Sequence, residues 1–367
     1  MDFPTLFFGV FFGVYALVLV LLIWPQPAQC QLKSYPHVSI LVAARNEVAT
    51  IERCLQALAG LNYPPALLEI LIGDDASTDD TRAVVRRFIA NKPQFRLLSI
   101  RRQLGTARGK SNVLAHLCRA ASAEAEYFLI TDADMSMNPN WVQTMVAAAL
   151  PDVGIVTGIT TASGPLFGRL QGLDWLFGLN LIRLLTNLGV PVTAIGNNML
   201  VRRAAYESIG GYEALAFSIC EDLQLFKQVV AQGWQFRNLI SPAALGISVP
   251  QPTVRHLLRQ RKRWMKGTAH LPWQLSALFG SYALFYTVLS WPGLWTLSTV
   301  ATLWVAKVGC QTLFLAVTLR QAGRREQLHV LLLYECYLLT MSLAVLVYTV
   351  WPHPIEWKER RYKWAEV

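Results

Sequence analysis

The sequence predicts an α/β domain with a mainly parallel, doubly wound sheet, together with apolar transmembrane helices near both ends of the chain. Two observations lead to this expectation. In the middle of the chain, short apolar runs typical of buried strands alternate with stretches of helical length. Residues 3–32 and 271–306 contain no charged side chain, and uncharged apolar stretches of this length can cross a bilayer.

The composition lies between that of a soluble protein and that of a purely membrane protein. Of the 367 residues, 53% are hydrophobic and only 15% are charged. The net charge of +10 fits basic flanks of membrane helices or a site for an anionic substrate. No nucleic-acid-binding motif is present, so we expect no nucleic-acid partner. The six cysteines lack CxxC spacing, which argues against a zinc site or a disulfide framework.

Residues 1–30 are interpreted as a retained transmembrane anchor. Leu6 to Trp24 is almost wholly apolar and long enough to span a bilayer. A cleaved signal peptide is the alternative, but the segment before the apolar run carries Asp2 and no Lys or Arg, and the run is too long. Three prolines then form an extended link into the domain expected over residues 37–267.

The first half of this domain alternates strands with helices, which predicts a parallel sheet. Gly109 and Lys110 open one of the helices, and its positive end suits a bound anion. We expect strands at Val38–Ala44, Leu67–Ile72, Phe95–Ile100 and from Tyr127, with helices up to Leu58, over Thr81–Ile89 and from Lys110.

The central strand of this set ends in two carboxylates, Asp132 and Asp134, separated by one residue. Side chains two apart in a strand point to the same face, so both should converge where open α/β sheets bind ligands. Converging carboxylates repel unless a cation neutralises them, which predicts a divalent ion that also holds phosphates.

Asp-x-Asp alone is a weak signal for a metal site. It is strengthened because Glu47, Asp74 and Asp75 follow two other strands and should reach the same edge. Solvated loops explain each acid singly but not their shared placement.

The second half of the domain ends in a helix that begins at Glu221-Asp222 and runs to about Gln232. Acids in a first helical turn are often mere helix-end electrostatics, so that alternative stays open for Asp222. The apolar segment Phe167–Leu188 either packs on the sheet or forms an acceptor wall at the membrane surface. Before that last helix we expect helices over Asn138–Leu150 and Phe167–Leu188 and strands over Gly154–Ile159 and Gly196–Val201.

A basic run from Arg255 to Lys266 contains Gln260, Arg263 and Trp264. One interpretation is a positive flank for the membrane segment that follows. The other is that arginine forks hold a diphosphate while Trp264 offers a flat face to a sugar or lipid group. Both interpretations can hold at once.

Residues 271–352 are interpreted as a second membrane region. We expect Gly280–Val305 to span the bilayer, with a second pass beginning within Val308–Leu319, and Leu328–Trp351 to form a further span. Glu335 interrupts this last span. It either has a function within the membrane or pairs with Lys307.

Two basic segments near the end of the chain give conflicting topology signals. The loop 320–325 and the basic tail 353–367 both have cytoplasmic character, yet one straight span would place them on opposite sides. A re-entrant segment would resolve the conflict, and the sequence alone leaves this open.

Taken in order, the motifs resemble those of membrane-bound family 2 glycosyltransferases. The match covers roughly residues 37–267, and the QxxRW tail is its most specific part. The group contains cellulose, chitin and hyaluronan synthases and also ceramide and carotenoid glucosyltransferases. The resemblance implies the GT-A fold, a nucleotide-sugar-binding α/β sandwich. The motifs are Arg45-Asn46-Glu47, Asp74-Asp75 with Ser77-Thr78-Asp79, Gly109-Lys110, Asp132-Ala133-Asp134, Glu221-Asp222 and Gln260 with Arg263-Trp264.

The resemblance implies a donor site for a nucleotide sugar, with a UDP-hexose as the expected donor. Glu47 and Asp75, with Asp74 as a neighbour, would contact the base and ribose, and Lys110 would lie near the phosphates. The Asp-x-Asp pair would hold the ribose and a Mg²⁺ or Mn²⁺ ion that bridges the diphosphate.

The resemblance also implies an inverting displacement. Asp222 would be the general base that takes the proton from the acceptor hydroxyl. Arg263 and the metal would neutralise charge on the leaving nucleoside diphosphate. Glu221, Gln260 and Trp264 would lie on the acceptor side.

We expect a lipid-like hydroxyl as the acceptor, because a polymer-secreting channel usually needs more transmembrane helices. Trp357-Lys358-Glu359-Arg360-Arg361-Tyr362 resembles a W-K-G-R-x-Y tail of lipid-type members, with Glu359 in place of glycine. Cys220 stands where processive synthases commonly have Thr. The alternatives are a small processive polysaccharide synthase and a non-catalytic nucleotide-sugar-binding component of glycan export. The expected location is a bacterial inner membrane, with the catalytic domain in the cytoplasm.

Overall fold

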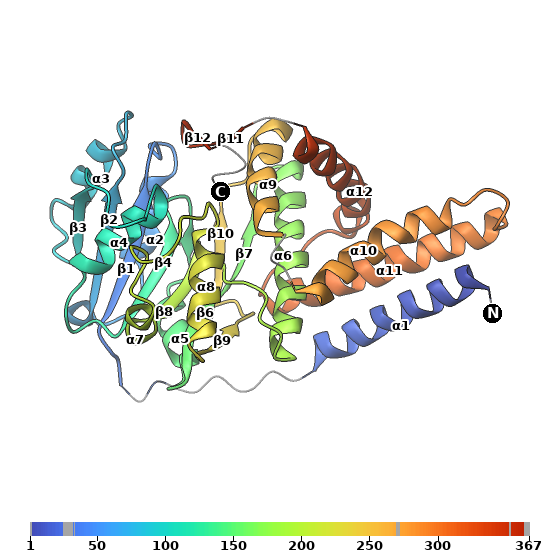
Figure 1. The fold of residues 1–367 in the computed structure, drawn as a ribbon, viewed down its shortest axis with the longest axis horizontal. Coiled ribbons are helices and arrows are strands. Elements are labelled where there is room, and N and C mark those ends of the chain that lie inside the picture. The colour runs from blue at the N-terminus through green and yellow to red at the C-terminus, as the bar shows by residue number, and fades with distance from the viewer. Residues whose placement is uncertain (1, 25–31, 33, 269–271, 352–353, 363–367) are drawn as a thin grey trace.

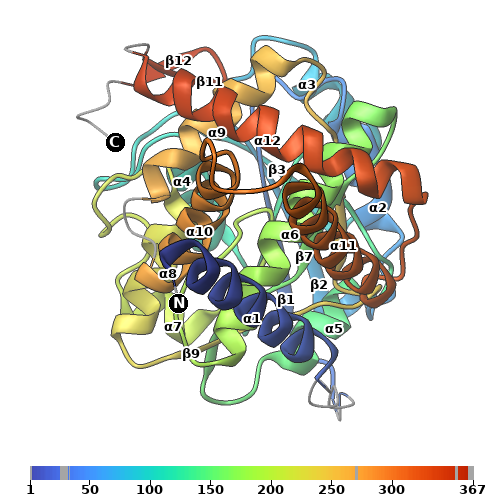
Figure 2. The same cartoon turned by 90° about the vertical axis from the view of Figure 1, so that its right-hand side faces the viewer.

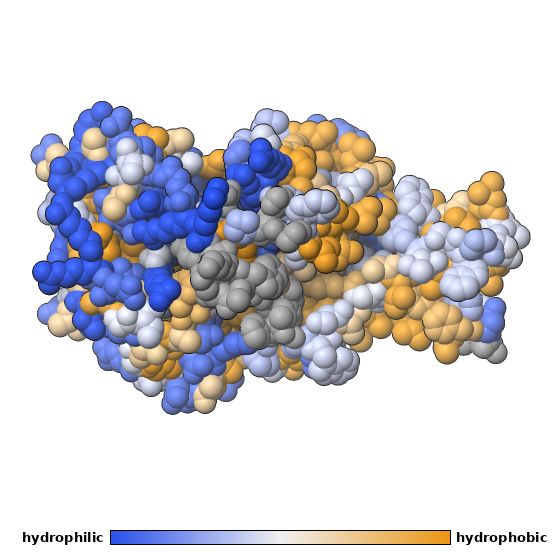
Figure 3. Space-filling model, turned by 45° about the horizontal axis from the view of Figure 1, so that its top comes forward, coloured by the Kyte–Doolittle hydropathy of each residue, from blue (hydrophilic) through white to orange (hydrophobic). Residues whose placement is uncertain are grey.

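The computed structural model describes residues 2–24, 32, 34–268, 272–351 and 354–362. An α/β domain carries a helical extension that leaves one side of it (Figure 1). The surface over the sheet domain is largely hydrophilic, and the surface over the helical end is largely hydrophobic (Figure 3). The fold therefore confirms the predicted combination of a polar α/β domain with apolar helices from both ends of the chain.

The core of the domain is a seven-stranded sheet in the order β3-β2-β1-β4-β8-β6-β9. The first four of these strands are mutually parallel, whereas β8 runs antiparallel to both β4 and β6. The strands are β1 Val38–Ala44, β2 Leu68–Asp74, β3 Phe95–Ser99, β4 Tyr127–Asp132, β6 Val153–Thr157, β8 Asn198–Arg202 and β9 Gln235–Asn238. The mainly parallel sheet is confirmed, and the antiparallel insertion of β8 is an addition that the sequence did not indicate.

Both faces of the sheet are buried, as continuous apolar strands predict. Ile40 and Ile70 point to one face and pack with α2, α3 and α5, while Leu41 and Leu71 point to the other and pack with α4, α7 and α8. The helices are α2 Ile51–Ala59, α3 Thr81–Ile89, α4 Lys110–Ala120, α5 Trp141–Ala148, α7 Arg203–Ser208 and α8 Glu221–Ala231, with a 3-10 turn at Pro65–Leu67.

The register of the three central strands places their carboxyl ends at one level. Ala43 of β1 pairs with Gly73 of β2 on one side and with Asp132 of β4 on the other. Gly73 lets α4 approach the sheet, because a Cβ there would lie 2.3 Å from Val113 Cγ1. The loops that follow these strands therefore share one edge of the sheet, as predicted.

Two elements of the α/β domain depart clearly from the bounds expected from the sequence. The strand expected over Gly154–Ile159 is in fact two strands, β6 and β7 (Ile159–Ala162), and they belong to different sheets. Gly158 lies at the break, where a Cβ would meet Ala244 O at 2.3 Å. The second sheet has the order β5-β10-β7, with β5 Ser136–Met137 and β10 Leu245–Ser248. Helix α5 is shorter than expected because a turn precedes Trp141, whose N–H donates to Asn138 O.

The segment from Phe167 forms one long helix, α6 Leu166–Asn187. It packs on β7 with one face and on α11 and α12 with another. The alternative in which it packs on a sheet is therefore confirmed, and the helix also contacts the apolar helices.

Three of the described helices are long and apolar enough to cross a membrane, namely α1 Phe3–Ile23, α11 Leu297–Gln321 and α12 Leu328–Val350. Figure 1 shows α1, α10 (Trp273–Leu289) and α11 extending together away from the sheet domain. The single span expected over Gly280–Val305 is wrong, because α10 ends at Leu289 and α11 starts at Leu297. The turn between them contains Gly293 with a φ of +74°, next to a proline.

Helix α12 does not follow the other apolar helices. It runs across them, along the side of the sheet domain (Figures 1 and 2). Before its first turn, Arg169 of α6 binds Glu326 with Nε to Oε2 at 3.0 Å. At its other end, Lys262 of α9 (Val254–Thr268) donates from Nζ to Trp351 O at 2.7 Å. Both ends of α12 thus contact helices that pack on the α/β domain.

An ion pair fixes the crossing of α11 and α12. Lys307 and Glu335 pair with essentially no exposure to the surroundings, and Lys307 Nζ also donates to Gln311 Oε1 at 3.1 Å. The ring centroids of Tyr282 and Tyr286 lie 5.2 and 5.3 Å from Lys307 Nζ. The structural alternative for Glu335 is therefore confirmed.

We expect Glu335→Ala to destabilise the protein in detergent by about 3–5 kcal/mol, because it leaves a buried ammonium without its partner. The double variant Lys307→Met/Glu335→Leu should recover most of this loss. Thermal unfolding of the purified protein measures both effects, with the exposed neighbour Cys336→Ala as control. Equal melting temperatures for the single and double variants would contradict the assignment.

Candidate active site

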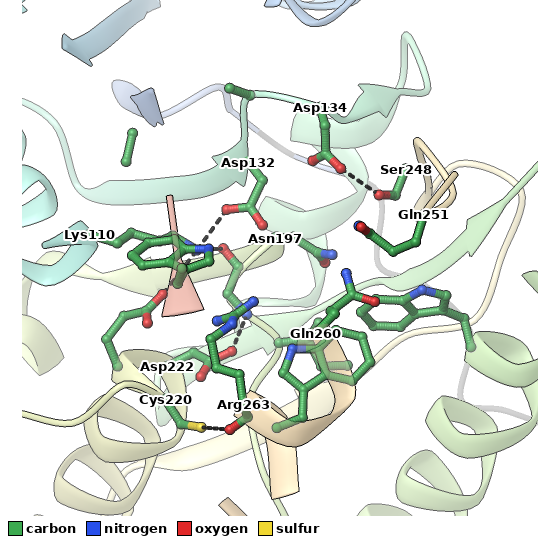
Figure 4. Close-up of a pocket in the computed structure, with 18 of the residues that line it drawn as sticks. Lys110, Asp132, Asp134, Asn197, Cys220, Asp222, Ser248, Gln251, Gln260 and Arg263 are labelled. Carbon is green, nitrogen blue, oxygen red and sulfur yellow. Dashed lines mark hydrogen bonds and ion pairs between the residues drawn. The ribbon is translucent and has the colours of Figure 1, made fainter. Parts of the chain in front are cut away.

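A cavity of about 550 Å³ opens at the shared strand edge, between the sheet domain and the helices α6, α9 and α10. Figure 4 shows Asp132, Asp134 and Lys110 facing Arg263 and Gln260 across this space. Ten of the eleven predicted site residues line the cavity, and they are Glu47, Asp75, Lys110, Asp132, Asp134, Glu221, Asp222, Gln260, Arg263 and Trp264. Residues far apart in the sequence are thus brought to one site.

The exception is Asp74, which does not line the cavity. It is the last residue of β2, is only 4% exposed, and accepts a hydrogen bond from Ser77 N at 3.3 Å. Consecutive side chains of an extended chain point to opposite sides, so Asp74 and Asp75 do not face the same space. Asp74 shapes the turn after β2, and only Asp75 faces the cavity.

Lys110 is the centre of charge in the site. Its Nζ lies 2.6 Å from Asp132 Oδ1 and 3.0 Å from Glu221 Oε1, and it also contacts Gly196 O at 3.5 Å. Burial lowers the pKa of Lys110, but Asp132, Glu221 and Asp222 outweigh it and raise the pKa above its usual value. The first residue of α4 is therefore a fixed cation that ties β4 to the start of α8.

Asp222 lies in the first turn of α8 with its carboxylate held by two backbone groups. Oδ2 accepts from Gly196 N at 2.8 Å, and Oδ1 accepts from Leu223 N at 2.8 Å. Burial and the neighbouring Glu221 raise the pKa of Asp222. A Cβ on Gly196 would lie 2.9 Å from Asp222 Cβ, so glycine is needed there for this approach. The result is an oriented carboxylate with increased proton affinity.

A turn, and not the predicted strand, positions Asp134 in the cavity. Strand β4 ends at Asp132, so alternation along a strand does not position Asp134, which lies in the turn before β5. Ser248 Oγ donates to Asp134 Oδ2 at 2.7 Å, and Arg53 holds the backbone oxygen of Asp134 at 2.5 Å. Burial, followed by the charge of Asp132, raises the pKa of Asp134 to about 6.

The residues around Asp132 and Asp134 could supply only part of a metal coordination shell. Within the described ranges, no group of three or more His, Cys, Asp or Glu side chains is arranged to hold a metal ion. The available donors are two carboxylates and the Ser248 hydroxyl, all oxygen atoms of the kind that Mg²⁺ and Mn²⁺ prefer. The site fits such an ion if a bound substrate completes the shell.

The basic side chains of helix α9 make several different contacts. Arg261 donates to Asp174 Oδ2 of α6 at 2.5 Å and stacks over Trp264 at 4.4 Å. Trp264 meets Trp175 edge-on, with ring centroids 4.7 Å apart. Arg263 faces the cavity, with its guanidinium 5.2 Å from the ring of Trp357. Only one arginine of the motif therefore remains positioned for an anion in the cavity.

The C-terminal hairpin is the part of the site that the sequence reasoning missed. Strands β11 Ile355–Trp357 and β12 Arg360–Tyr362 join through Lys358 and Glu359, both with positive φ, as in a two-residue type I′ turn. Lys358 Nζ lies 2.7 Å from Glu47 Oε1. Arg360 binds both oxygens of Asp75, at 2.8 and 3.0 Å. The W-K-G-R-x-Y resemblance singled out this segment, but it did not predict that the segment pairs with Glu47 and Asp75.

The comparisons with known proteins agree with this geometry. A family model described as glycosyl transferase family 21 matches residues 3–366. The chain belongs to this family. The predicted kinship with membrane-bound glycosyltransferases is thereby confirmed, and the family is specified as family 21.

Relatives of this family 21 chain include lipid-modifying enzymes. The beta-monoglucosyldiacylglycerol synthase of Nostoc sp. is 30% identical over 260 residues, which are 70% of this chain and 54% of the relative. The enzyme of the same name from Synechocystis sp. is 29% identical over 237 residues, 64% of this chain and 48% of the relative. The chain spans about half the length of these relatives.

A solved structure shares the fold of the family 21 chain. The mannosyltransferase PcManGT from Pyrobaculum calidifontis, in complex with GDP-Man and Mn²⁺, superimposes with a TM-score of 0.62 at 21% identity. The superposition covers 94% of this chain and 96% of the mannosyltransferase. The predicted GT-A-like fold, including the apolar helices, is thus confirmed.

We expect Lys110→Met to destabilise the protein by about 3 kcal/mol at pH 8, because buried carboxylates lose their counter-charge. Lys110 lowers the pKa of Asp222, so in the variant that pKa rises further in the folded state and stability should recover as the pH falls towards 6. Melting temperatures at the two pH values measure this. Lys227→Met, which removes a lysine of α8 outside the cavity, should show no such pH dependence. A pH-independent loss for Lys110→Met would contradict the proposed charge balance.

Proposed function

We propose that this protein is a membrane-bound, metal-dependent, inverting glycosyltransferase that moves a hexose from a nucleoside-diphosphate sugar to a lipid-like hydroxyl. The observation that carries the proposal is that Asp134, Asp222 and Arg263 open onto one cavity. They come from three separate parts of the chain, and each has the chemistry that one part of the reaction requires. If these three side chains faced different surfaces, they could not act together in one reaction.

Asp222 would act as the general base. Its raised pKa, caused by burial and by Glu221, gives the carboxylate the proton affinity needed to take a proton from an attacking hydroxyl. The N–H groups of Gly196 and Leu223 fix its orientation without occupying the whole carboxylate. Direct attack by the acceptor oxygen inverts the anomeric carbon, so an α-linked donor gives a β-glycoside.

The donor would lie between the strand edge and the C-terminal hairpin. Glu47 and Asp75 would contact the nucleoside, and Lys110, Arg263 and Arg360 supply positive charge for the diphosphate. Hydrogen-bond donors fixed in the cavity before the reaction stabilise negative charge that develops on the leaving group.

Asp132 and Asp134 would hold a Mg²⁺ or Mn²⁺ ion, with Asp134 as the freer carboxylate because Asp132 already pairs with Lys110. A bound ion of this kind supplies electrostatic stabilisation of the diphosphate leaving group. Support comes from the all-oxygen donor set and from the Mn²⁺ in the complex of the structurally similar mannosyltransferase.

The acceptor would be a lipid. Two relatives are named as synthases of a glucosylated diacylglycerol, and the cavity has an apolar wall formed by α6 and α10. A small processive polysaccharide synthase is the second candidate, and a non-catalytic export component is the third. Incubating membranes with labelled nucleotide sugars separates them: one sugar on an extractable lipid, a long polymer, or no turnover.

The sheet domain would lie on the cytoplasmic side of a bacterial inner membrane, where nucleotide sugars are made. Cysteine accessibility in inverted and right-side-out vesicles would test this side assignment.

We expect Asp222→Asn to reduce transfer by at least about a thousandfold, in the range of lost general-base catalysis, while donor binding stays within about twofold. Initial rates and isothermal titration with UDP and Mn²⁺ measure the two quantities. Asp152→Asn, at an exposed position outside the cavity, is the matched control. Full transfer by Asp222→Asn would remove the proposed base.

We expect Arg360→Ala to weaken binding of a nucleoside diphosphate about tenfold, or about 1.4 kcal/mol, because the cavity loses a positive charge. Arg361→Ala removes the same charge from the next residue, which does not line the cavity, and should leave the affinity unchanged. Titrations at fixed ionic strength compare the two. An equal loss in both would show that only the overall charge matters.

A further inference from the structure

Part of the cavity wall is apolar. It is formed by α6 and α10 and consists of Trp175, Gly178, Leu179, Ile182, Leu275 and Phe279. On α6 these residues follow the spacing i, i+3, i+4 and i+7, so they form one straight stripe about 10 Å long. Leu275 and Phe279 stand one turn apart on α10 and face this stripe.

The acid next to this stripe is paired. Asp174, next to the stripe, is neutralised by Arg261 at 2.5 Å and also accepts from Tyr334 Oη at 3.2 Å. Trp175 and Trp264 meet at the boundary between the apolar and polar halves, where rings with one polar edge are favoured. An uncharged hydrocarbon chain fits this surface, whereas a sugar polymer would leave its hydroxyls without partners.

Gly178 stands out from the other glycines of α6. Gly168 and Gly172 are needed for close packing, because a Cβ there would meet Pro250 Cγ at 2.9 Å and Ala162 O at 2.2 Å. A Cβ at Gly178 would meet nothing within 4 Å. Packing does not require glycine at this helical position, where glycine costs about 1 kcal/mol relative to alanine. The open space above Gly178 is therefore part of the groove.

Phe279 links this wall to the apolar helices. It is 45% exposed and lies on α10, which extends with α1 and α11 away from the sheet domain (Figure 1). A chain that leaves the cavity over Phe279 arrives at the apolar helices and not in bulk solvent.

We propose that the groove between α6 and α10 seats a hydrocarbon chain of an uncharged lipid alcohol such as a diacylglycerol, and that Gly178 sets its width. This proposal rests on the proposed lipid acceptor. The chain lies over Gly178, the two tryptophans contact the glycerol region, and the hydroxyl reaches Asp222. Gly178 is thus a specificity-determining position for the acceptor.

Gly178→Leu tests the proposal, because a Cβ there meets no described atom within 4 Å and leucine is favoured over glycine in a helix. With dioleoylglycerol as the acceptor probe, transfer should fall at least tenfold through a raised acceptor KM. Short-chain dihexanoylglycerol, which needs less of the groove, should lose less than threefold, and binding of UDP should not change.

Gly309→Leu is the matched control. Gly309 lies in α11, also has nothing within 4 Å of its Cβ position, and does not line the cavity. It should behave like the unaltered protein with both acceptors. Equal activity of Gly178→Leu and Gly309→Leu on dioleoylglycerol would overturn the proposal.

A binding measurement separates failure of the groove from failure of the proposed function. A diacylglycerol with a photoreactive group in one acyl chain should label α6 or α10 in the unaltered protein, and labelling should fall in Gly178→Leu. If the unaltered protein transfers sugar to dioleoylglycerol but the label maps elsewhere, the groove is wrong and the function stands. If it neither transfers sugar to diacylglycerol nor shows labelling, both are wrong.

Discussion

The contacts of Lys110 hold the active site together. Its ammonium touches carboxylates from the end of β4 and the start of α8, and it reaches the loop before β8 through Gly196 O. Each of these acids would repel the others in a buried space, and burial would penalise each charge. One cation at the positive end of α4 offsets both effects, so the acids can stay close and charged without a bound ligand. The positions of these acids are thus fixed before any ligand binds.

The sequence predicted at which edge of the sheet the site residues gather, because this depends only on which residues come at the end of each strand. Glu47, Asp75 and Asp132 follow apolar strands directly, and parallel pairing alone then brings them to one level. The sequence did not separate Asp74 from Asp75, since that depends on which side of β2 faces the crevice. It assigned Asp134 to the site for an incorrect reason, because a turn and Ser248 position this residue.

The arrangement of the apolar helices was less predictable, since hydropathy indicates the length of an apolar helix but not its direction in the fold. The turn at Gly293 that divides α10 from α11 was visible as a proline-glycine pair within an uncharged run, and that signal was given too little weight. The direction of α12 could not be inferred. It depends on contacts of its two ends with Arg169 and Lys262, which lie far away in the sequence. The same limit applies to the hairpin, whose partners are about three hundred residues earlier.

The pairing of Lys358 with Glu47 and of Arg360 with Asp75 has a consequence for biosynthesis. The acids emerge from the ribosome first, and the cations follow only after α10, α11 and α12 have been made. A nascent chain can complete the α/β sandwich early, but the hairpin can close the wall of the cavity only after these apolar helices. Synthesis of the apolar helices and completion of the cavity wall are therefore coupled in time.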